Sequence, residues 1–396
     1  MTPDANTMVG VVGAGTMGAG IAQLAAVRGH RVILADAIPA GLERARSGMT
    51  RILARQVEKG RMTQAEADAA LARVKFVAGA DDAQWAEFAP CGVVVEAITE
   101  DLSAKKAVLG ALEQVVAPDA WLGTNTSSLS VAALAAGRQH PGRVVGIHFF
   151  NPAPVMPLVE IVGALTTDPA VVNGARAFMA GWGKTPVVAS DTPGFIVNRI
   201  ARPFYGEALR MAEEGLADYA TIDWAMRAVG GFRMGPFELM DFIGNDVNYA
   251  VTCSVFESTF YDPRYRPSIT QRRLVEAGWL GRKAKRGYYD YRNGTELPAP
   301  VEDTALGRRI ADRIIALLIN EAVDALHLRV ASAADIELAM TTGVNYPKGL
   351  LAWGDEIGVP TVLQRVAHLH EEYGEDRYRP SPLLRRLARD ARGILA

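Results

Sequence analysis

The chain has 396 residues, of which 49% are hydrophobic and 22% are charged, and its formal net charge is -2. This length exceeds what one hydrophobic core usually supports, so we expect two or three domains. The near-neutral charge favours neither nucleic acid nor an anionic membrane as a partner, and Cys91 and Cys253 are too isolated to suggest disulfides or a metal site. With a polar N-terminus and no membrane-spanning stretch, the sequence predicts a cytoplasmic protein that acts on small molecules.

The first organised pattern is MVGVVGAGTMGAGIAQLAAVRGHRVILADA, residues 8–37. A β-branched run, a glycine-rich turn, an alanine-rich helix and an apolar run ending at Asp36 predict a βαβ unit that binds a dinucleotide. The three glycines permit a tight turn, approach of the backbone to a pyrophosphate, and close packing of helix on strand, while the helix N-terminus offers N–H groups to phosphate. Asp36 favours NAD over NADP, because a carboxylate accepts hydrogen bonds from ribose hydroxyls and repels a 2′-phosphate. The predicted turn contains Gly13, Gly15, Thr16, Met17 and Gly18.

Further strands are predicted at residues 93–98, 121–128 and 143–152, with a helical pair at residues 38–75 and a helix after residue 99. In an open parallel sheet, ligands bind outside the carboxyl ends of the strands. We therefore expect a substrate near the polar residues that follow these strands, namely Asn125, Ser127, His148 and Asn151.

His148 and Glu160 are ionisable residues in the otherwise apolar stretch GIHFFNPAPVMPLVEIV, residues 146–162. Taken alone, His148 is compatible with an interior histidine that is hydrogen-bonded to the backbone. A buried carboxylate needs a partner, however, and Glu160 would orient the imidazole and stabilise its charged form. Such a pair makes His148 a candidate general base for the oxidation of an alcohol by NAD.

Five motifs together resemble the 3-hydroxyacyl-CoA dehydrogenase family: VGAGTMGAGIA, TNTSSLS, GIHFFNPAPVMPLVEIV, DTPGFIVNRI and GPFELMDFIG. The resemblance implies reversible, NAD-dependent oxidation of an L-3-hydroxyacyl-CoA to the 3-oxoacyl-CoA. It also implies that His148 is the base, that Glu160 orients it, and that Ser127 and Asn198 contact the 3-oxygen of the substrate.

The same resemblance implies the remaining ligand contacts. Asn151 would lie beside the nicotinamide, and Glu100, Lys105 and Lys283 match positions that contact the cofactor, as does Ser127. Lys59 falls in a loosely aligned segment at a position that contacts CoA.

The predicted fold class is α/β: a Rossmann-type NAD-binding domain at residues 1–190, followed by two tandem helical domains at residues 191–296 and 297–396. The second helical segment repeats the first, since residues 198–247 can be laid against residues 312–361 with coincident glycines and charges. Asp312 replaces Asn198, so the second copy is expected to be non-catalytic. We expect the copies to pack on each other within one chain, and the sequence leaves further homo-oligomerisation open.

The two-copy layout most resembles the 3-hydroxyadipyl-CoA dehydrogenases of phenylacetate breakdown. Arg233 could pair with the terminal carboxylate of such a substrate, or it could be a surface arginine or a contact to CoA phosphate. A short-chain 3-hydroxybutyryl-CoA dehydrogenase is the main alternative. A non-catalytic, crystallin-like protein that binds NADH is a further one, and the His–Glu pair argues against the β-hydroxyacid dehydrogenases, which use a lysine base.

Overall fold

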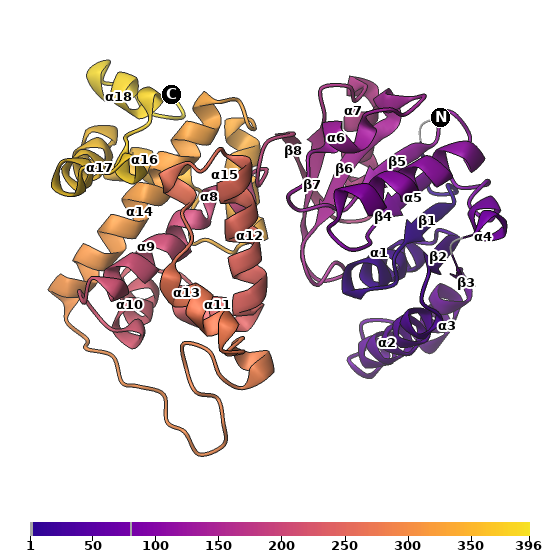
Figure 1. Ribbon diagram of the computed structural model, residues 1–396, viewed down its shortest axis with the longest axis horizontal. Coiled ribbons are helices and arrows are strands. Elements are labelled where there is room, and N and C mark those ends of the chain that lie inside the picture. Colours follow the sequence, from indigo (N-terminus) through magenta and orange to yellow (C-terminus); the bar gives the residue numbers. More distant parts are fainter. Residues whose placement is uncertain (1–2, 80) are drawn as a thin grey trace. The chain divides into compact units, whose positions relative to one another are not determined.

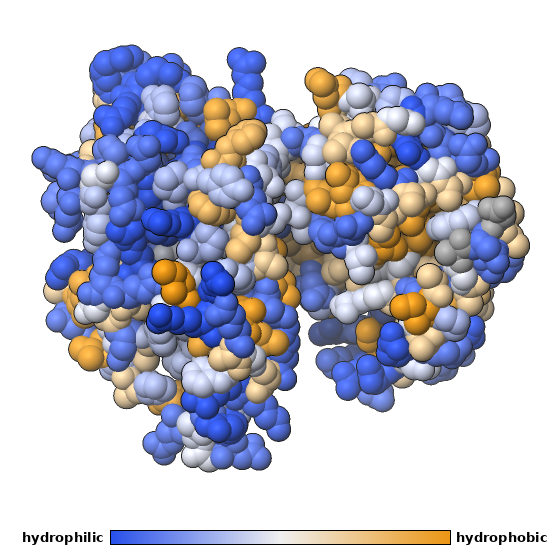
Figure 2. Space-filling view, viewed as in Figure 1, coloured by the Kyte–Doolittle hydropathy of each residue, from blue (hydrophilic) through white to orange (hydrophobic). Residues whose placement is uncertain are grey.

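The computed structural model describes residues 3–79 and 81–396, which form two compact units that meet in sequence between Thr192 and Pro193. The first unit is α/β and the second is helical (Figure 1). None of the helices in the described part of the chain combines the length and the apolar character needed to cross a membrane. On the face shown in Figure 2, hydrophilic residues dominate the surface of the helical unit.

The first unit is built on one eight-stranded sheet with the order β3-β2-β1-β4-β5-β6-β7-β8. Strands β1 to β6 run parallel, whereas β7 pairs antiparallel with β6 and β8 continues parallel to β7. The carboxyl ends of β1 to β6 therefore lie at one edge of the sheet. The strands are β1 (Val9–Val12), β2 (Val32–Asp36), β3 (Val74–Ala78), β4 (Val93–Glu96), β5 (Trp121–Thr124), β6 (Val144–Phe149), β7 (Leu158–Gly163) and β8 (Thr185–Ser190).

Helices cover the sheet because its central strands are apolar on both faces, as parallel strands usually are. Ile21 of α1 and Phe178 of α7 share one core with Val11 of β1 and Ile147 of β6. The helices are α1 (Thr16–Val27), α2 (Pro39–Glu58), α3 (Gln64–Ala72), α4 (Asp82–Ala86), α5 (Leu102–Val115), α6 (Val131–Ala135) and α7 (Pro169–Gly181), with a 3-10 turn η1 (Pro141–Arg143).

The α/β prediction is confirmed, but three strands, β3, β7 and β8, were not predicted. The helical pair expected at residues 38–75 is present as α2 and α3, and it is followed by β3 at the edge of the sheet. Lys75 in this strand is exposed, which breaks the apolar run that marks a buried strand. The other two unpredicted strands, β7 and β8, lie at the opposite side of the sheet, where β8 is the last strand.

The helical unit is organised around α14 (Thr304–His327), most of whose residues are buried. It packs against α9 and η2 from the first helical segment and against α16, α17 and α18 from the second. The other elements are α8 (Val197–Ile200), α9 (Arg202–Glu213), α10 (Tyr219–Trp224), the π-helix η2 (Ala225–Val229), α11 (Pro236–Ile243), α12 (Asn245–Ser258), η3 (Pro263–Tyr265), α13 (Ile269–Glu276), η4 (Arg282–Ala284), α15 (Ala333–Gly343), α16 (Leu350–Ile357), α17 (Val359–Tyr373), η5 (Asp376–Tyr378) and α18 (Pro382–Arg389).

Corresponding residues of the two helical segments exchange ion pairs. Arg199 of the first segment donates from Nε to Glu321 of the second at 2.9 Å, and Arg313 of the second pairs with Glu207 of the first. Because the sequence repeat aligns Arg199 with Arg313 and Glu207 with Glu321, this exchange gives the interface an approximate two-fold character. Gly244 and Gly358, also aligned by the repeat, have φ angles of 105° and 94° at equivalent helix junctions.

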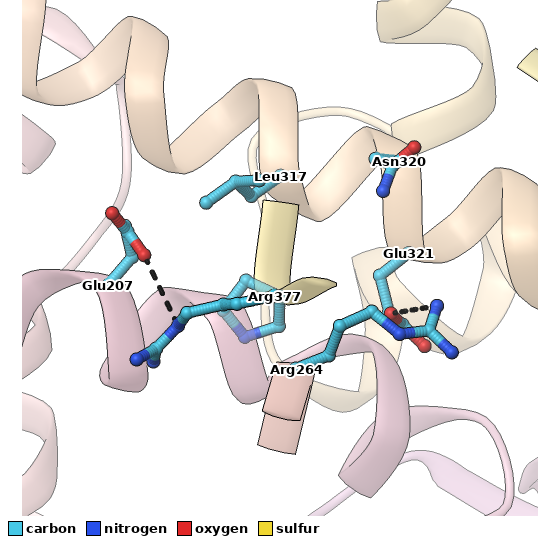
Figure 3. Close-up of a pocket in the computed structure, with 7 residues that line it drawn as sticks. Glu207, Arg264, Leu317, Asn320, Glu321 and Arg377 are labelled. Atoms are coloured by element: carbon cyan, nitrogen blue, oxygen red, sulfur yellow. Dashed lines mark hydrogen bonds and ion pairs between the residues drawn. The ribbon is translucent and has the colours of Figure 1, made fainter. Parts of the chain in front are cut away.

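A recess of about 20 Å³ lies among these ion pairs (Figure 3). In the close-up, Arg377 points to Glu207 and Arg264 points to Glu321, so both carboxylates are neutralised. The volume suffices for about one water molecule, and the recess is therefore a packing feature of the interface.

Candidate active site

The glycine-rich turn after β1 contains three glycines with different steric surroundings. Gly13 has φ 103°, and a Cβ there would lie 2.6 Å from the carbonyl oxygen of Ala97. A Cβ on Gly18 would lie 1.8 Å from the carbonyl oxygen of Gly13. A Cβ on Gly15, the N-cap of α1, would meet nothing within 4 Å. Packing within the protein therefore explains Gly13 and Gly18, whereas the open space at Gly15 suits a ligand that approaches the backbone.

Asp36 lies at the carboxyl end of β2, where its carboxylate is held by the backbone. It accepts hydrogen bonds from the N–H of Ala14 at 2.6 Å and from the N–H of Ile38 at 2.8 Å. Each carboxylate oxygen can accept more than one hydrogen bond, so both remain able to accept from a ribose. Asp36 and the glycine-rich turn are thus joined in one rigid arrangement that fits the adenosine half of NAD.

His148 and Glu160 face each other across the antiparallel pair formed by β6 and β7, where they are direct register partners. Their side chains are joined by a hydrogen bond of 2.7 Å between Nδ1 and Oε2. The side chain of His148 is 7% exposed and that of Glu160 is fully buried. The carboxylate therefore orients the imidazole with little competition from water.

Ser127 follows β5 and is positioned by Glu100, which follows β4. Glu100 Oε1 accepts hydrogen bonds from Thr126 Oγ1 at 2.6 Å and from the N–H groups of Ser127 and Ser128 at 2.8 and 3.2 Å. Burial opposes ionisation of this carboxyl, but Lys105 and the hydrogen-bond donors outweigh burial and lower its pKa. Glu100 is therefore an anion that fixes the turn carrying Ser127.

Lys105, which was expected to contact the cofactor, is buried between two carboxylates, and its contact with the cofactor stays a prediction. Its side chain is 1% exposed, and Nζ lies 2.7 Å from Glu96 and 3.2 Å from Glu100. Glu96 also accepts from Thr124 Oγ1 at 2.8 Å. Sequence reasoning missed Glu96, although a carboxylate that ends the apolar run VVVE signals a buried partner. Lys105 thus links the buried Glu96 to Glu100, which positions Ser127.

Asn151 is exposed in the loop that joins β6 to β7. The buried Lys184 holds this loop, since its Nζ donates to the carbonyl oxygens of Ala153 and Met156 at 2.5 and 2.7 Å. Burial, with a contribution from Arg28, lowers the pKa of Lys184 to about 8. The loop that follows His148 is thereby tied to the residue that precedes β8.

The four other predicted site residues lie away from this cluster in the sequence. Lys59 is exposed at the C-terminus of α2 in the first unit. In the helical unit, Asn198 is half-buried on α8, Arg233 is exposed, and Lys283 forms an ion pair of 2.6 Å with Asp246. The structure brings together Glu100, Ser127, His148, Glu160 and Asn151 near the carboxyl ends of the parallel strands. The roles of all the predicted site residues stay predictions.

Comparison with known proteins agrees with this arrangement. Residues 8–192 match the 3-hydroxyacyl-CoA dehydrogenase NAD-binding domain, and residues 194–291 and 310–393 both match the C-terminal domain of that family. The chain is 39% identical to a 3-hydroxyadipyl-CoA dehydrogenase of Escherichia coli over 96% of this chain and 97% of the relative. It is 41% identical to a 3-hydroxybutyryl-CoA dehydrogenase of Bradyrhizobium diazoefficiens, over 73% of this chain and 97% of the relative.

A solved structure described as 3-hydroxybutyryl-CoA dehydrogenase from Escherichia coli has a TM-score of 0.90 and 38% sequence identity, and it covers 97% of this chain and 98% of its own. The chain belongs to the 3-hydroxyacyl-CoA dehydrogenase family. It is thus an NAD-dependent oxidoreductase, and the open backbone at Gly15 and the fixed carboxylate of Asp36 fit that cofactor.

Proposed function

We propose that the enzyme oxidises the 3-hydroxyl of an L-3-hydroxyacyl-CoA with His148 as general base. The observation that carries this assignment is the buried hydrogen bond of 2.7 Å between His148 and Glu160 at the carboxyl edge of the sheet. NAD, when bound, supplies the hydride acceptor. Glu160 holds the Nδ1–H tautomer, so that Nε2 of His148 accepts the hydroxyl proton as the hydride leaves C3.

Ser127 and Asn198 hold the 3-oxygen as it changes from hydroxyl to ketone. The turn containing Ser127 is fixed by Glu100, which reduces the reorganisation needed when the carbonyl forms. In the reverse direction His148 donates the proton. Asn151 lies beside the nicotinamide in this proposal, and Lys59 and Lys283 provide positive charge for CoA and the cofactor.

For the acyl group, we propose 3-hydroxyadipyl-CoA. The relative with this named activity matches the chain over nearly its whole length, whereas the 3-hydroxybutyryl-CoA relative from Bradyrhizobium matches only 73% of it. The second candidate is 3-hydroxybutyryl-CoA, which is favoured by the description of a full-length solved neighbour. We further propose a cytoplasmic location, consistent with two cysteines that form no disulfide.

The test of reaction class is the loss of NADH absorbance with acetoacetyl-CoA and 3-oxoadipyl-CoA as substrates. We expect His148→Ala to lower kcat by about 10²- to 10⁴-fold, the usual contribution of a general base. Glu160→Gln keeps an acceptor but removes the charge, and we expect about a 10- to 100-fold loss. A matched control is His140→Ala, because His140 is exposed just before the start of β6, whereas His148 lies near the end of that strand.

NADH binding is measured in the same samples by fluorescence titration, and we expect it to be retained in both site variants. A wild-type enzyme that binds NADH but reduces neither thioester would contradict the proposed reaction. Equal activity of His148→Ala and His140→Ala would contradict the assignment of the base.

A further inference from the structure

Arg202, the first residue of α9, is a buried cation that lacks a carboxylate partner among the described residues. It is 6% exposed, its Nη1 donates to Thr252 Oγ1 at 2.9 Å, and its Nε has no hydrogen-bond partner. By contrast, Arg143 and Arg199, which are similarly buried, pair with Glu113 and Glu321. The Tyr205 ring lies 5.0 Å from the Arg202 guanidinium carbon, but an aromatic ring carries no net negative charge, and a buried cation without a counter-charge is destabilising.

A second buried polar group without a partner interacts with this guanidinium. Tyr346, from the second helical segment, is 5% exposed, and its hydroxyl makes no hydrogen bond. Its ring contacts Phe204, two residues beyond Arg202 on α9, at a centroid distance of 5.8 Å, so Tyr346 lies beside the start of this helix. One unused N–H and one unused O–H next to a positive charge suit an anionic ligand whose oxygens accept hydrogen bonds.

Arg202 is also one helical turn beyond Asn198. The single residue between α8 and α9, Ala201, has φ -76° and ψ -7°, so the backbone stays helical through the junction. Residues four apart on a helix share a face, with Cβ atoms about 5–6 Å apart. In the proposed function Asn198 contacts the 3-oxygen of the substrate, and a group that binds near Arg202 would therefore lie a few ångströms along the acyl chain.

We propose that Arg202 and Tyr346 bind the terminal carboxylate of a dicarboxylyl-CoA substrate, an inference that rests on the proposed function. In a six-carbon chain the carboxylate carbon is three bonds from C3, about 4 Å in an extended chain, which is compatible with one helical turn. An arginine can bind a carboxylate through two parallel hydrogen bonds, and little water reaches a side chain that is 6% exposed. Arg233, considered above for this role, is exposed, so solvent can stabilise its charge without a counter-ion.

This assignment gives the second helical segment a part in substrate binding. Tyr346 lies between α15 and α16, and its ring contacts Phe204 and Phe232 of the first segment at centroid distances of 5.8 and 5.0 Å. The carboxylate site is thus made by both segments of one chain.

The experiment compares kcat/KM for 3-oxoadipyl-CoA and acetoacetyl-CoA in the wild type and variants. The selectivity is the ratio of the two values, and a purely structural defect would lower both values without changing their ratio. We expect Arg202→Met to lower the ratio at least about 30-fold, since removal of one partner of a buried charge pair is costly. We expect Tyr346→Phe, which removes one oxygen, to lower it about tenfold. Arg272→Gln is the control, because Arg272 is an exposed arginine on α13 of the same unit.

A ratio within about twofold of the wild-type value in Arg202→Met or, if that variant does not fold, in Tyr346→Phe would overturn the inference. If Arg233→Gln strongly lowered the kcat/KM ratio and Arg202→Met left it unchanged, the binding of the substrate's terminal carboxylate would be assigned to Arg233 instead. Both outcomes leave the proposed reaction intact, whereas a wild type that reduces neither thioester overturns the proposed function and this inference with it.

Discussion

Replacement of Gly15 by alanine separates the ligand-binding role of the glycine-rich turn from its structural role. The φ and ψ angles of Gly15 are -66° and -175°, which alanine adopts without strain, and its Cβ would meet nothing within 4 Å. Loss of a glycine N-cap is unfavourable, but alanine lowers the entropy of the unfolded chain, so stability should change by less than about 1 kcal/mol.

The same change should weaken NADH binding, because the added methyl group occupies space that the pyrophosphate needs. We expect the Kd for NADH to rise at least about tenfold, equivalent to about 1.4 kcal/mol. Gly18→Ala is the contrasting variant. Its Cβ would lie 1.8 Å from the carbonyl oxygen of Gly13, so the turn must move and the free energy of unfolding should fall by about 3 kcal/mol or more.

The assays are urea denaturation for stability and fluorescence titration for the Kd of NADH, performed on both variants and the wild type. Unchanged NADH affinity in a folded Gly15→Ala protein would refute the argument that the open space at this glycine receives the pyrophosphate. Wild-type stability in Gly18→Ala would refute the steric analysis of the turn.

Two further predictions concern the cofactor and the helical unit. Asp36→Ser should raise the Kd for NADH about tenfold or more and reduce the protein's preference for NADH over NADPH, because the charge at the end of β2 is lost. If paired titrations showed an unchanged preference, they would argue against Asp36 as the residue that selects NADH. Burial raises the pKa of Asp223 to about 7, against hydrogen bonds from Tyr289 and the start of α11. The folded pKa exceeds the unfolded one, so the stabilising effect of protonation is full below about pH 4 and is lost as the pH rises through about 7. Urea unfolding at about pH 6 and about pH 8 should show lower stability at the higher pH, by at least about 1 kcal/mol, and Asp223→Asn should reduce this difference; equal pH dependence in both proteins would exclude Asp223 as its source.

Local patterns in the sequence were sufficient to predict the nucleotide-binding part of the fold. The apolar run at β1, the glycine spacing and Asp36 are neighbours within one βαβ unit, so their geometry follows from short-range rules. The same applies to the position of His148 at the end of an apolar strand. The family resemblance then supplied roles for residues such as Asn198 that lie far away in the sequence.

Other features depended on pairings between distant segments, which no local pattern encodes. His148 meets Glu160 because β7 turns back antiparallel to β6 in one particular register, and a shift by one residue would point Glu160 to the opposite face. The burial of Lys105 depends on its ion pair with Glu96. The arginine–glutamate pairs between the two helical segments form only when these segments pack together.

Arg202 shows the same division most clearly. Its sequence context, RIARPFYG, gives no reason to single out this arginine, since an arginine near a helix start is ordinarily solvated. Tertiary packing buries it without a carboxylate and brings Tyr346 near it from more than a hundred residues away. The sequence alone thus determined the class of chemistry. Arg202 became a candidate for substrate selectivity only through its burial, because the desolvation of a charge is a property of the folded chain.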